Sequence, residues 1–158
     1  MINILVLCTG NSARSILLES ILTHHSAMRI TGYSAGSKPA GKVHPQSLKM
    51  LHDYDFPTDH LRSKSWDEFS GPDAPAMDVV ITVCGSAAGE TCPIWAGAPI
   101  RVHWGVEDPA AADPADWDTA FQTAYDKLHV RADALFALPF EDMDTATLTK
   151  ELQTIGTL

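Results

Sequence analysis

The sequence predicts an α/β protein, a small doubly wound sheet of four parallel strands in the order 2-1-3-4 with helices on both faces. Apolar strand-like runs alternate with helix-like segments from the start of the chain, and no internal repeat interrupts the alternation. The first run, residues 3–7, is nearly all apolar, which is typical of a strand buried on both faces of a parallel sheet. A length of 158 residues fits one domain.

The first half of the chain is expected to form two strands and two helices. A turn that contains Gly10 follows the first strand, and the helical spacing of apolar residues begins near Ala13. A second strand is expected over residues 29–34. Pro45 then begins a second helix, because proline is tolerated in the first turn, and this helix ends at residues 55–57.

The second half supplies two more strands and a long helix. After a proline-containing stretch, residues 78–83 form the most apolar internal run, which we expect to be the third strand. Residues 100–103 are expected to form the fourth strand. Residues 117–138 have the apolar spacing of a long amphipathic helix.

The C-terminal residues 139–158 are expected to be an extension of a main domain that spans residues 1–138. The pattern over residues 143–152 fits a short helix. Three apolar side chains are available to pack on the main domain or on a second subunit, namely Leu148, Leu152 and Ile155. We expect a monomer or a weak dimer.

Charge and composition exclude several classes of partner. The chain has 20 acidic and 11 basic side chains, and its net charge of −9 is the wrong sign for binding nucleic acid or an anionic membrane. No apolar run approaches the roughly 18 residues of a membrane span, and the N-terminus lacks the basic flank of a signal peptide. Three cysteines are too few for a disulfide scaffold, so we expect a protein of the reducing cytoplasm.

Two of the cysteines end strands that the predicted order makes neighbours. Cys8 follows the first strand and Cys84 follows the third. Ligands bind beyond the carboxyl ends of such strands, so we expect both thiols at the same mouth of the sheet.

The turn after the first strand has the composition of an oxyanion site. Cys8 precedes Arg14 by six positions, between a buried strand and a helix start. Backbone N–H groups and the positive end of the helix suit a tetrahedral anion, and the Arg14 fork can hold two of its oxygens. The same donors predict a lowered pKa for a nucleophilic Cys8, and Ser15 is placed to donate to its sulfur. The loop residues expected to line the cradle are Thr9, Gly10, Asn11, Ser12 and Ala13.

This loop resembles that of the low-molecular-weight protein tyrosine phosphatases and of the arsenate reductases built on the same fold. The resemblance covers about residues 2–137. Its other segments are Tyr33-Ser34-Ala35-Gly36-Ser37, Val43-His44-Pro45, Val83-Cys84-Gly85-Ser86-Ala87-Ala88 and His103-Trp104-Gly105-Val106-Glu107-Asp108-Pro109-Ala110. It implies a catalytic domain over residues 1–138.

The resemblance implies that Asp108 is the general acid, because the family carries this group in an Asp-Pro pair after the fourth strand. A protonated carboxyl neutralises the oxygen that leaves when Cys8 attacks. Asp113 begins a second Asp-Pro pair, but His103-Trp104-Gly105 aligns the first, and we interpret Asp113 as a residue that precedes a helix. An Asp-Pro pair without such a resemblance is more often a simple turn.

Thiol and aromatic usage favours the reductase branch. Three alanines follow Pro109 where a phosphatase is expected to place an aromatic ring clamp, and reduction of arsenate needs additional thiols. The resemblance implies a relay in which Cys8 attacks arsenate, Cys84 attacks Cys8 and releases arsenite, and Cys92 attacks Cys84. Thioredoxin, or glutathione with glutaredoxin, would restore the thiols. The alternative is a phosphatase that hydrolyses phosphate monoesters through a Cys8 phosphoenzyme, and phosphate or sulfate would mimic arsenate.

Four residues are expected to support the loop or its surroundings. Asn11 is expected to bond the loop backbone, with Ser34 behind it. The resemblance implies a monovalent-cation position near this pair, with Glu19 as a ligand, and we expect the ammonium of Lys64 to take the place of the ion. No bound metal or cofactor is expected, because Cys84, Cys92 and His103 lack the close spacing of a zinc site. A purely structural role for Cys84 in the core stays an alternative.

Overall fold

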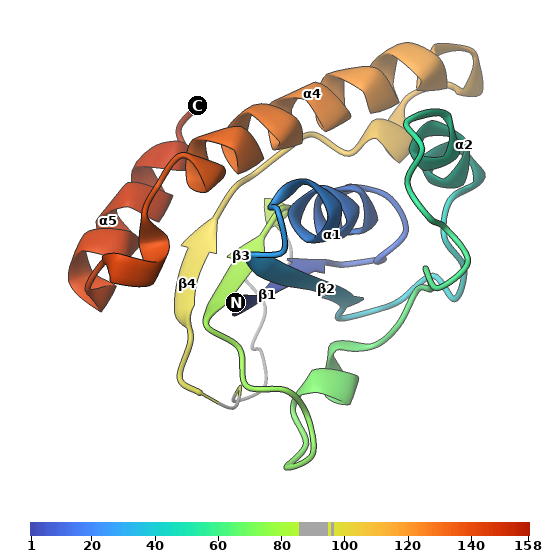
Figure 1. Ribbon diagram of the computed structural model, residues 1–158. Coiled ribbons are helices and arrows are strands. Elements are labelled where there is room, and N and C mark those ends of the chain that lie inside the picture. Colours follow the sequence, from blue (N-terminus) through green and yellow to red (C-terminus); the bar gives the residue numbers. More distant parts are fainter. Residues whose placement is uncertain (86–94, 96) are drawn as a thin grey trace.

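A computed structural model describes residues 1–85, 95 and 97–158, and Figure 1 shows the arrangement of the elements. The strands and α-helices are β1 (Ile2–Cys8), α1 (Arg14–His25), β2 (Ile30–Gly36), α2 (Pro45–Asp53), β3 (Val79–Thr82), β4 (Ile100–His103), α4 (Trp117–Phe136) and α5 (Thr145–Ile155). The described residues also form short 3₁₀ helices, namely η1 (Trp66–Phe69), η2 (Pro109–Ala111), η3 (Pro114–Asp116) and η4 (Phe140–Asp142). Every strand and long helix that the sequence predicts is present, with ends that differ by a few residues.

The sheet has the predicted order β2-β1-β3-β4, and all three strand pairs are parallel. The register places Leu7 opposite Thr82 and Cys8 opposite Gly36. Val83 N donates to Leu7 O at 3.0 Å, one step beyond the last paired residues. The carboxyl ends of β1 and β3 therefore stop at the same edge of the sheet.

Two cores cover the two faces of the sheet because side chains alternate along each strand. The larger core joins Ile4 and Val6 to α1, α2, α4 and α5. The smaller core joins Leu5 and Leu7 to Phe69 of η1 and to Trp95. Among the described residues, the α-helices belong to the larger core, and the helical element on the other face is the short 3₁₀ helix η1, which contributes Phe69 to the smaller core.

α1 lies between the sheet and α4, as Figure 1 shows. Residues 15–22 of this helix are buried without interruption. A helix that is buried on every side is typical of a central position, and this position makes α1 a rigid support for the loop before it.

The C-terminal residues pack on the main body of the chain, which resolves the alternative that the sequence leaves open. Leu148, Leu152 and Ile155 of α5 join the larger core. The buried Trp104 donates from Nε1 to Leu152 O at 2.9 Å. Within the described residues, no helix is both long and apolar enough to cross a membrane.

Candidate active site

The loop between β1 and α1 forms the site that the sequence predicts. Cys8, the last residue of β1, is 4% exposed, and Arg14 begins α1. Asn11 has a φ of +47°, in the left-handed region that asparagine tolerates better than most residues. This turn brings the chain back toward the sheet and allows the loop to surround the sulfur.

Backbone N–H groups of residues 38–44 bond three carbonyl groups of the loop, which therefore point away from the inside of the loop. The hydrogen bonds run from Lys38 N to Thr9 O (3.0 Å), from Ala40 N to Gly10 O (2.9 Å) and from His44 N to Ser12 O (3.0 Å). In a planar trans peptide, the N–H that follows a carbonyl points the opposite way. The N–H groups of Gly10, Asn11 and Ala13 are therefore directed to the inner side of the loop, where that of Gly10 donates to the Cys8 sulfur.

Two serine hydroxyls that sequence reasoning missed reinforce this orientation. Ser63 Oγ donates to Gly10 O at 3.0 Å and accepts from Gly41 N at 3.2 Å. Ser47 Oγ, which is fully buried, donates to Ser12 O at 2.9 Å. A serine in a loop or in a first helical turn carries no sequence signal for such a distant contact.

Gly36 allows the end of β2 to approach the loop closely. A Cβ at this position would collide with Thr9 O and would lie 3.1 Å from Asn11 Cβ. The Ser-Ala-Gly segment noted in the sequence thus needs its glycine for close backbone approach.

Asn11 and Ser15 form the inner support of the loop. Asn11 Nδ2 donates to Ser15 Oγ at 2.8 Å, and Asn11 Oδ1 accepts from Lys64 N at 3.0 Å. Because Ser15 accepts this bond, its own hydroxyl proton is available to a sulfur in the loop. Both side chains are fully buried, so these bonds hold one geometry.

Behind the loop lies a buried ion pair. Lys64 Nζ is 3.7 Å from Glu19 Oε1, 3.5 Å from Ser34 Oγ and 3.1 Å from Arg62 O. Ser34 Oγ donates to Glu19 Oε1 at 2.8 Å. Burial lowers the pKa of Lys64, and the Glu19 carboxylate opposes that shift. The ammonium thus lies among the oxygens where the sequence analysis expects a cation.

Arg14 is held against the loop that follows β4. Its Nη1 donates to Val106 O at 2.9 Å, and its Nη2 lies 3.7 Å from Asp108 Oδ2. Among the described residues, the buried Nε of Arg14 has no hydrogen-bond partner. A buried donor without a partner is uncommon in proteins and suits a site that binds an anion.

Asp108 occupies the place predicted for a general acid. The side chain is 44% exposed, and its Oδ1 accepts from Ala110 N at 3.0 Å at the start of η2. Asp113 instead precedes η3 and makes no such capping bond. The structure therefore brings Asp108, and not Asp113, to Arg14.

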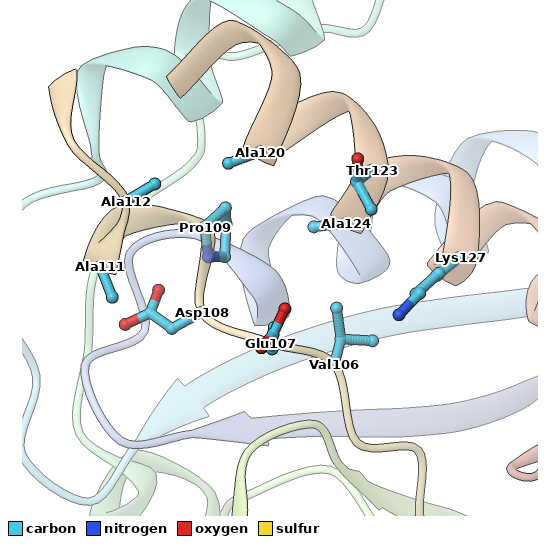
Figure 2. Close-up of a pocket in the computed structure, with 10 residues that line it drawn as sticks. All are labelled: Val106, Glu107, Asp108, Pro109, Ala111, Ala112, Ala120, Thr123, Ala124 and Lys127. Carbon is cyan, nitrogen blue, oxygen red and sulfur yellow. The ribbon is translucent and has the colours of Figure 1, made fainter. Parts of the chain in front are cut away.

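A hollow of about 440 Å³ adjoins Asp108, between the loop after β4 and α4 (Figure 2). One face of α4 lines it with Ala120, Thr123, Ala124 and Lys127. The residues on the loop side are Val106, Glu107, Asp108, Pro109, Ala111 and Ala112. Figure 2 shows no aromatic ring among these residues, in agreement with the missing ring clamp.

Cys84 lies beside Cys8, as the strand order predicts. Its Sγ is 3.4 Å from Thr9 Oγ1, and it is hydrogen-bonded to the Cys8 thiol. This bond, followed by burial, raises the pKa of Cys8, against the lowering effects of Arg14 and of the Gly10 N–H. The expectation of a lowered pKa was therefore wrong, because it counted the donors of the loop and not the second thiol. Cys92 lies outside the described residues.

Comparisons with known proteins agree with this geometry. Residues 3–154 match the model of the low molecular weight phosphotyrosine protein phosphatase family. An arsenate reductase of Halalkalibacterium halodurans is 36% identical over 110 residues, which cover 70% of this chain and 76% of the relative. A solved arsenate reductase in the phosphate-binding state has a TM-score of 0.71 at 26% identity, with 87% and 98% of the two chains covered. A thioredoxin-dependent arsenate reductase of Corynebacterium glutamicum shares the fold, with a TM-score of 0.63 at 23% identity over 86% of this chain and 60% of that one.

Proposed function

The chain belongs to the low molecular weight phosphotyrosine protein phosphatase family, and from this premise we propose that it reduces arsenate to arsenite. The observation that carries the proposal is the second buried thiol, Cys84, in hydrogen-bonding contact with the nucleophile Cys8. Hydrolysis of a phosphate ester needs only one sulfur, whereas reduction needs a second sulfur to take up the oxidation. Relatives that match most of the chain are arsenate reductases.

The first step is attack of the Cys8 thiolate on the arsenic of a bound arsenate. The inward N–H groups and Arg14 hold the oxygens of the anion, and they stabilise the charge that builds up on them. Asp108, in its protonated form, donates a proton to the departing oxygen, which leaves as water. The product is a Cys8 thioester of arsenic in which the arsenic is still pentavalent.

The second step transfers two electrons from sulfur to arsenic. The Cys84 thiolate attacks Cys8 Sγ, the S–As bond breaks, and its electron pair stays on arsenic, which leaves as arsenite. The Cys8–Cys84 disulfide is then attacked by Cys92, which returns Cys8 as a thiol and leaves a Cys84–Cys92 disulfide. This pairing requires the two Cα atoms to come within about 7 Å of each other.

An external thiol must then reduce the Cys84–Cys92 disulfide. We propose thioredoxin, or glutathione with glutaredoxin, as the donor, and the cytoplasm as the compartment, because a relay of free thiols works only where reductant is present.

A second activity, hydrolysis of phosphate monoesters through a Cys8 phosphoenzyme, is supported by the shared parts of the site. Cys8, Arg14 and Asp108 are the groups that such hydrolysis needs. The alanine-lined hollow beside Asp108 offers no ring for stacking an aryl group, so we expect this hydrolysis to be slow.

The test compares the wild type with Cys8→Ser, Cys84→Ser and Cys92→Ser. Arsenite formation is measured with thioredoxin and with glutathione plus glutaredoxin, and hydrolysis of an aryl phosphate is measured in parallel. We expect all three variants to lose multiple-turnover arsenate reduction and only Cys8→Ser to lose hydrolysis. Fast hydrolysis without arsenate reduction in the wild type would show a phosphatase instead.

A further inference from the structure

Two histidines meet at the end of α1 that lies away from the candidate active site. His25 is the last residue of α1, which begins at Arg14, and a helix of 12 residues is roughly 18 Å long. His25 Nδ1 lies 3.3 Å from Nε2 of His129 on α4. The two residues are 104 positions apart in the chain, so the sequence shows no metal-binding spacing. The pair takes no part in the proposed function.

The neighbours of the two rings determine where their lone pairs lie. His129 Nδ1 is 3.0 Å from Asp133 Oδ2, one turn further along α4, and a carboxylate in this position accepts a proton from Nδ1. A neutral His129 then has its lone pair on Nε2, the nitrogen that faces His25. His25 can carry its own proton on the other ring nitrogen, since a neutral imidazole holds one proton on either. Both facing nitrogens are thus able to act as metal ligands.

We propose that His25 Nδ1 and His129 Nε2 bind a zinc ion between them, with Asp133 as the residue that orients the His129 ring. Zinc–nitrogen bonds are about 2.0–2.1 Å long, so two nitrogens of a tetrahedral zinc site are about 3.3 Å apart, which is the separation of this pair. Imidazole nitrogens suit zinc and similar transition metals, whereas magnesium and calcium prefer oxygen ligands. A carboxylate behind a ligating histidine is the usual arrangement at such sites.

Aromatic contacts hold both rings in place before a metal binds. His25 is stacked on Phe56 with the ring centroids 4.8 Å apart, and the centroid of His129 lies 5.7 Å from that of Tyr125. Little side-chain ordering is then needed on binding. Partial desolvation, followed by the neighbouring His129, lowers the pKa of His25, and Asp133 opposes that shift. This lowering favours the neutral ring that a metal ion requires.

The pair opens into a hollow that can hold the remaining ligands. Its volume is about 430 Å³, and it is lined by both histidines and by Tyr54, Tyr125, Asp126 and Val130. In the part of the chain that the structure describes, no group of three or more His, Cys, Asp or Glu side chains is arranged to hold a metal. We therefore expect water in the other coordination positions, and each water molecule needs only about 30 Å³. The carboxylates of Asp126 and Asp133 favour the approach of a cation.

The test titrates zinc sulfate into the wild type, His25→Ala and His129→Ala and follows binding by calorimetry. Zinc that binds to cysteines does so in all of these proteins, so the histidine site is the one equivalent per chain that the variants lose. We expect either variant to weaken this equivalent at least about a hundredfold, because two ligands held together bind as a chelate. Excess magnesium should not displace the zinc. His52→Ala, which removes an exposed histidine of α2, is the matched control and should bind as the wild type does.

A second pair of variants tests the orienting carboxylate. Asp133→Asn should weaken zinc binding about tenfold to a hundredfold, whereas Asp126→Asn removes the same charge from the hollow and should have little effect. Urea unfolding without zinc checks that each variant is folded, and His25→Gln or His129→Gln replaces an alanine variant that is not.

Three outcomes would overturn the proposal. They are equal zinc binding by the wild type and both histidine variants, a loss in His52→Ala, and a loss in Asp126→Asn as large as that in Asp133→Asn. Arsenate plays no part in these measurements, so failure of this proposal and failure of the proposed function are distinguishable.

Discussion

At the scale of single residues, Thr9 acts on two thiols through different atoms. Its carbonyl is turned outward by Lys38, which directs the following N–H toward Cys8, and its hydroxyl lies 3.4 Å from Cys84 Sγ. The bond to the Thr9 carbonyl belongs to the backbone, so it should remain when the Thr9 side chain is replaced. The contact between the Thr9 hydroxyl and Cys84 Sγ belongs to the side chain, so a substitution of Thr9 can remove it without removing the backbone bond.

Thr9→Val should therefore slow the attack of Cys84 more than the attack of Cys8. A hydrogen bond to a charged group contributes about 1.5–3 kcal/mol, so we expect kcat for arsenate reduction to fall about tenfold or more. Hydrolysis of an aryl phosphate should fall much less. Thr9→Ser restores the hydroxyl and should restore reduction. Equal losses in both reactions would mean that the valine disturbs the loop as a whole.

The contact between the two thiols makes the titration of Cys8 depend on Cys84. The hydrogen bond with Cys84 is the largest cause that raises the pKa of Cys8. Cys84→Ala removes it, so the pKa of Cys8 should fall and more thiolate should be present at neutral pH. The pH at which alkylation of Cys8 reaches half its maximal rate should shift downward. The same pH in Cys84→Ala and in the wild type would contradict this assignment, and Cys92→Ala provides the comparison.

The buried ion pair behind the loop predicts a large effect of one substitution. Lys64→Met leaves the Glu19 carboxylate buried without its cation, which typically costs about 3–5 kcal/mol. The free energy of unfolding in urea should fall by this amount, and potassium chloride should restore part of it while leaving the wild type unchanged. Glu19→Gln added to Lys64→Met should recover stability, because no buried charge remains. Lys49→Met, which removes an exposed pair with Asp53, serves as the control.

At the scale of elements, the hydrophobic pattern was enough to place every strand and long helix. The expected strand at residues 100–103 has the observed bounds, and Pro45 begins α2 as expected. The strand order followed from right-handed connections, and it placed Cys84 beside Cys8. These predictions succeed because periodicity and chirality act locally and apply to any sequence of this type.

The contacts that orient the loop could not be predicted in the same way. Ser63 and Gly10 are distant in the chain, and a serine in a polar loop looks the same whether or not it bonds a carbonyl. The pKa of Cys8 was misjudged for a related reason. The loop alone predicts its lowering, whereas the contact with Cys84 appears only when two strands are placed side by side.

The C-terminal helix illustrates a contact whose energetic role can be measured. Leu152 is fully buried in α5, and its carbonyl accepts the indole N–H of Trp104. Leu152→Ala should lower the free energy of unfolding by about 2–5 kcal/mol, through lost burial and the remaining cavity. Gln153→Ala, at an exposed position of the same helix, should have little effect. If Leu152→Ala unfolds at the same urea concentration as the wild type, α5 does not help to stabilise the main body.

At the scale of the whole molecule, a net charge of −9 opposes the approach of an arsenate anion, so a positive charge near the site is expected to favour that approach. Lys42 provides such a charge. It lies within residues 38–44, whose backbone N–H groups donate to carbonyl groups of the loop after β1. Its charge also acts on His44. The pKa of His44 is lowered, chiefly by burial and also by Lys42, while Asp108 opposes that shift. His44 is thus within electrostatic reach of both Lys42 and the proposed acid, Asp108.

Two substitutions with the same change of net charge separate local from global electrostatics. Lys42→Glu places negative charge at the mouth, and Lys150→Glu places it on the exposed side of α5. We expect Lys42→Glu to lower kcat/KM for arsenate severalfold at low salt, with little change in kcat, because charge near a site acts on the encounter with the anion. The deficit should shrink as salt rises, since the Debye length is about 8 Å at physiological ionic strength. Equal effects of the two variants would mean that net charge, and not the position of Lys42, governs the approach of arsenate.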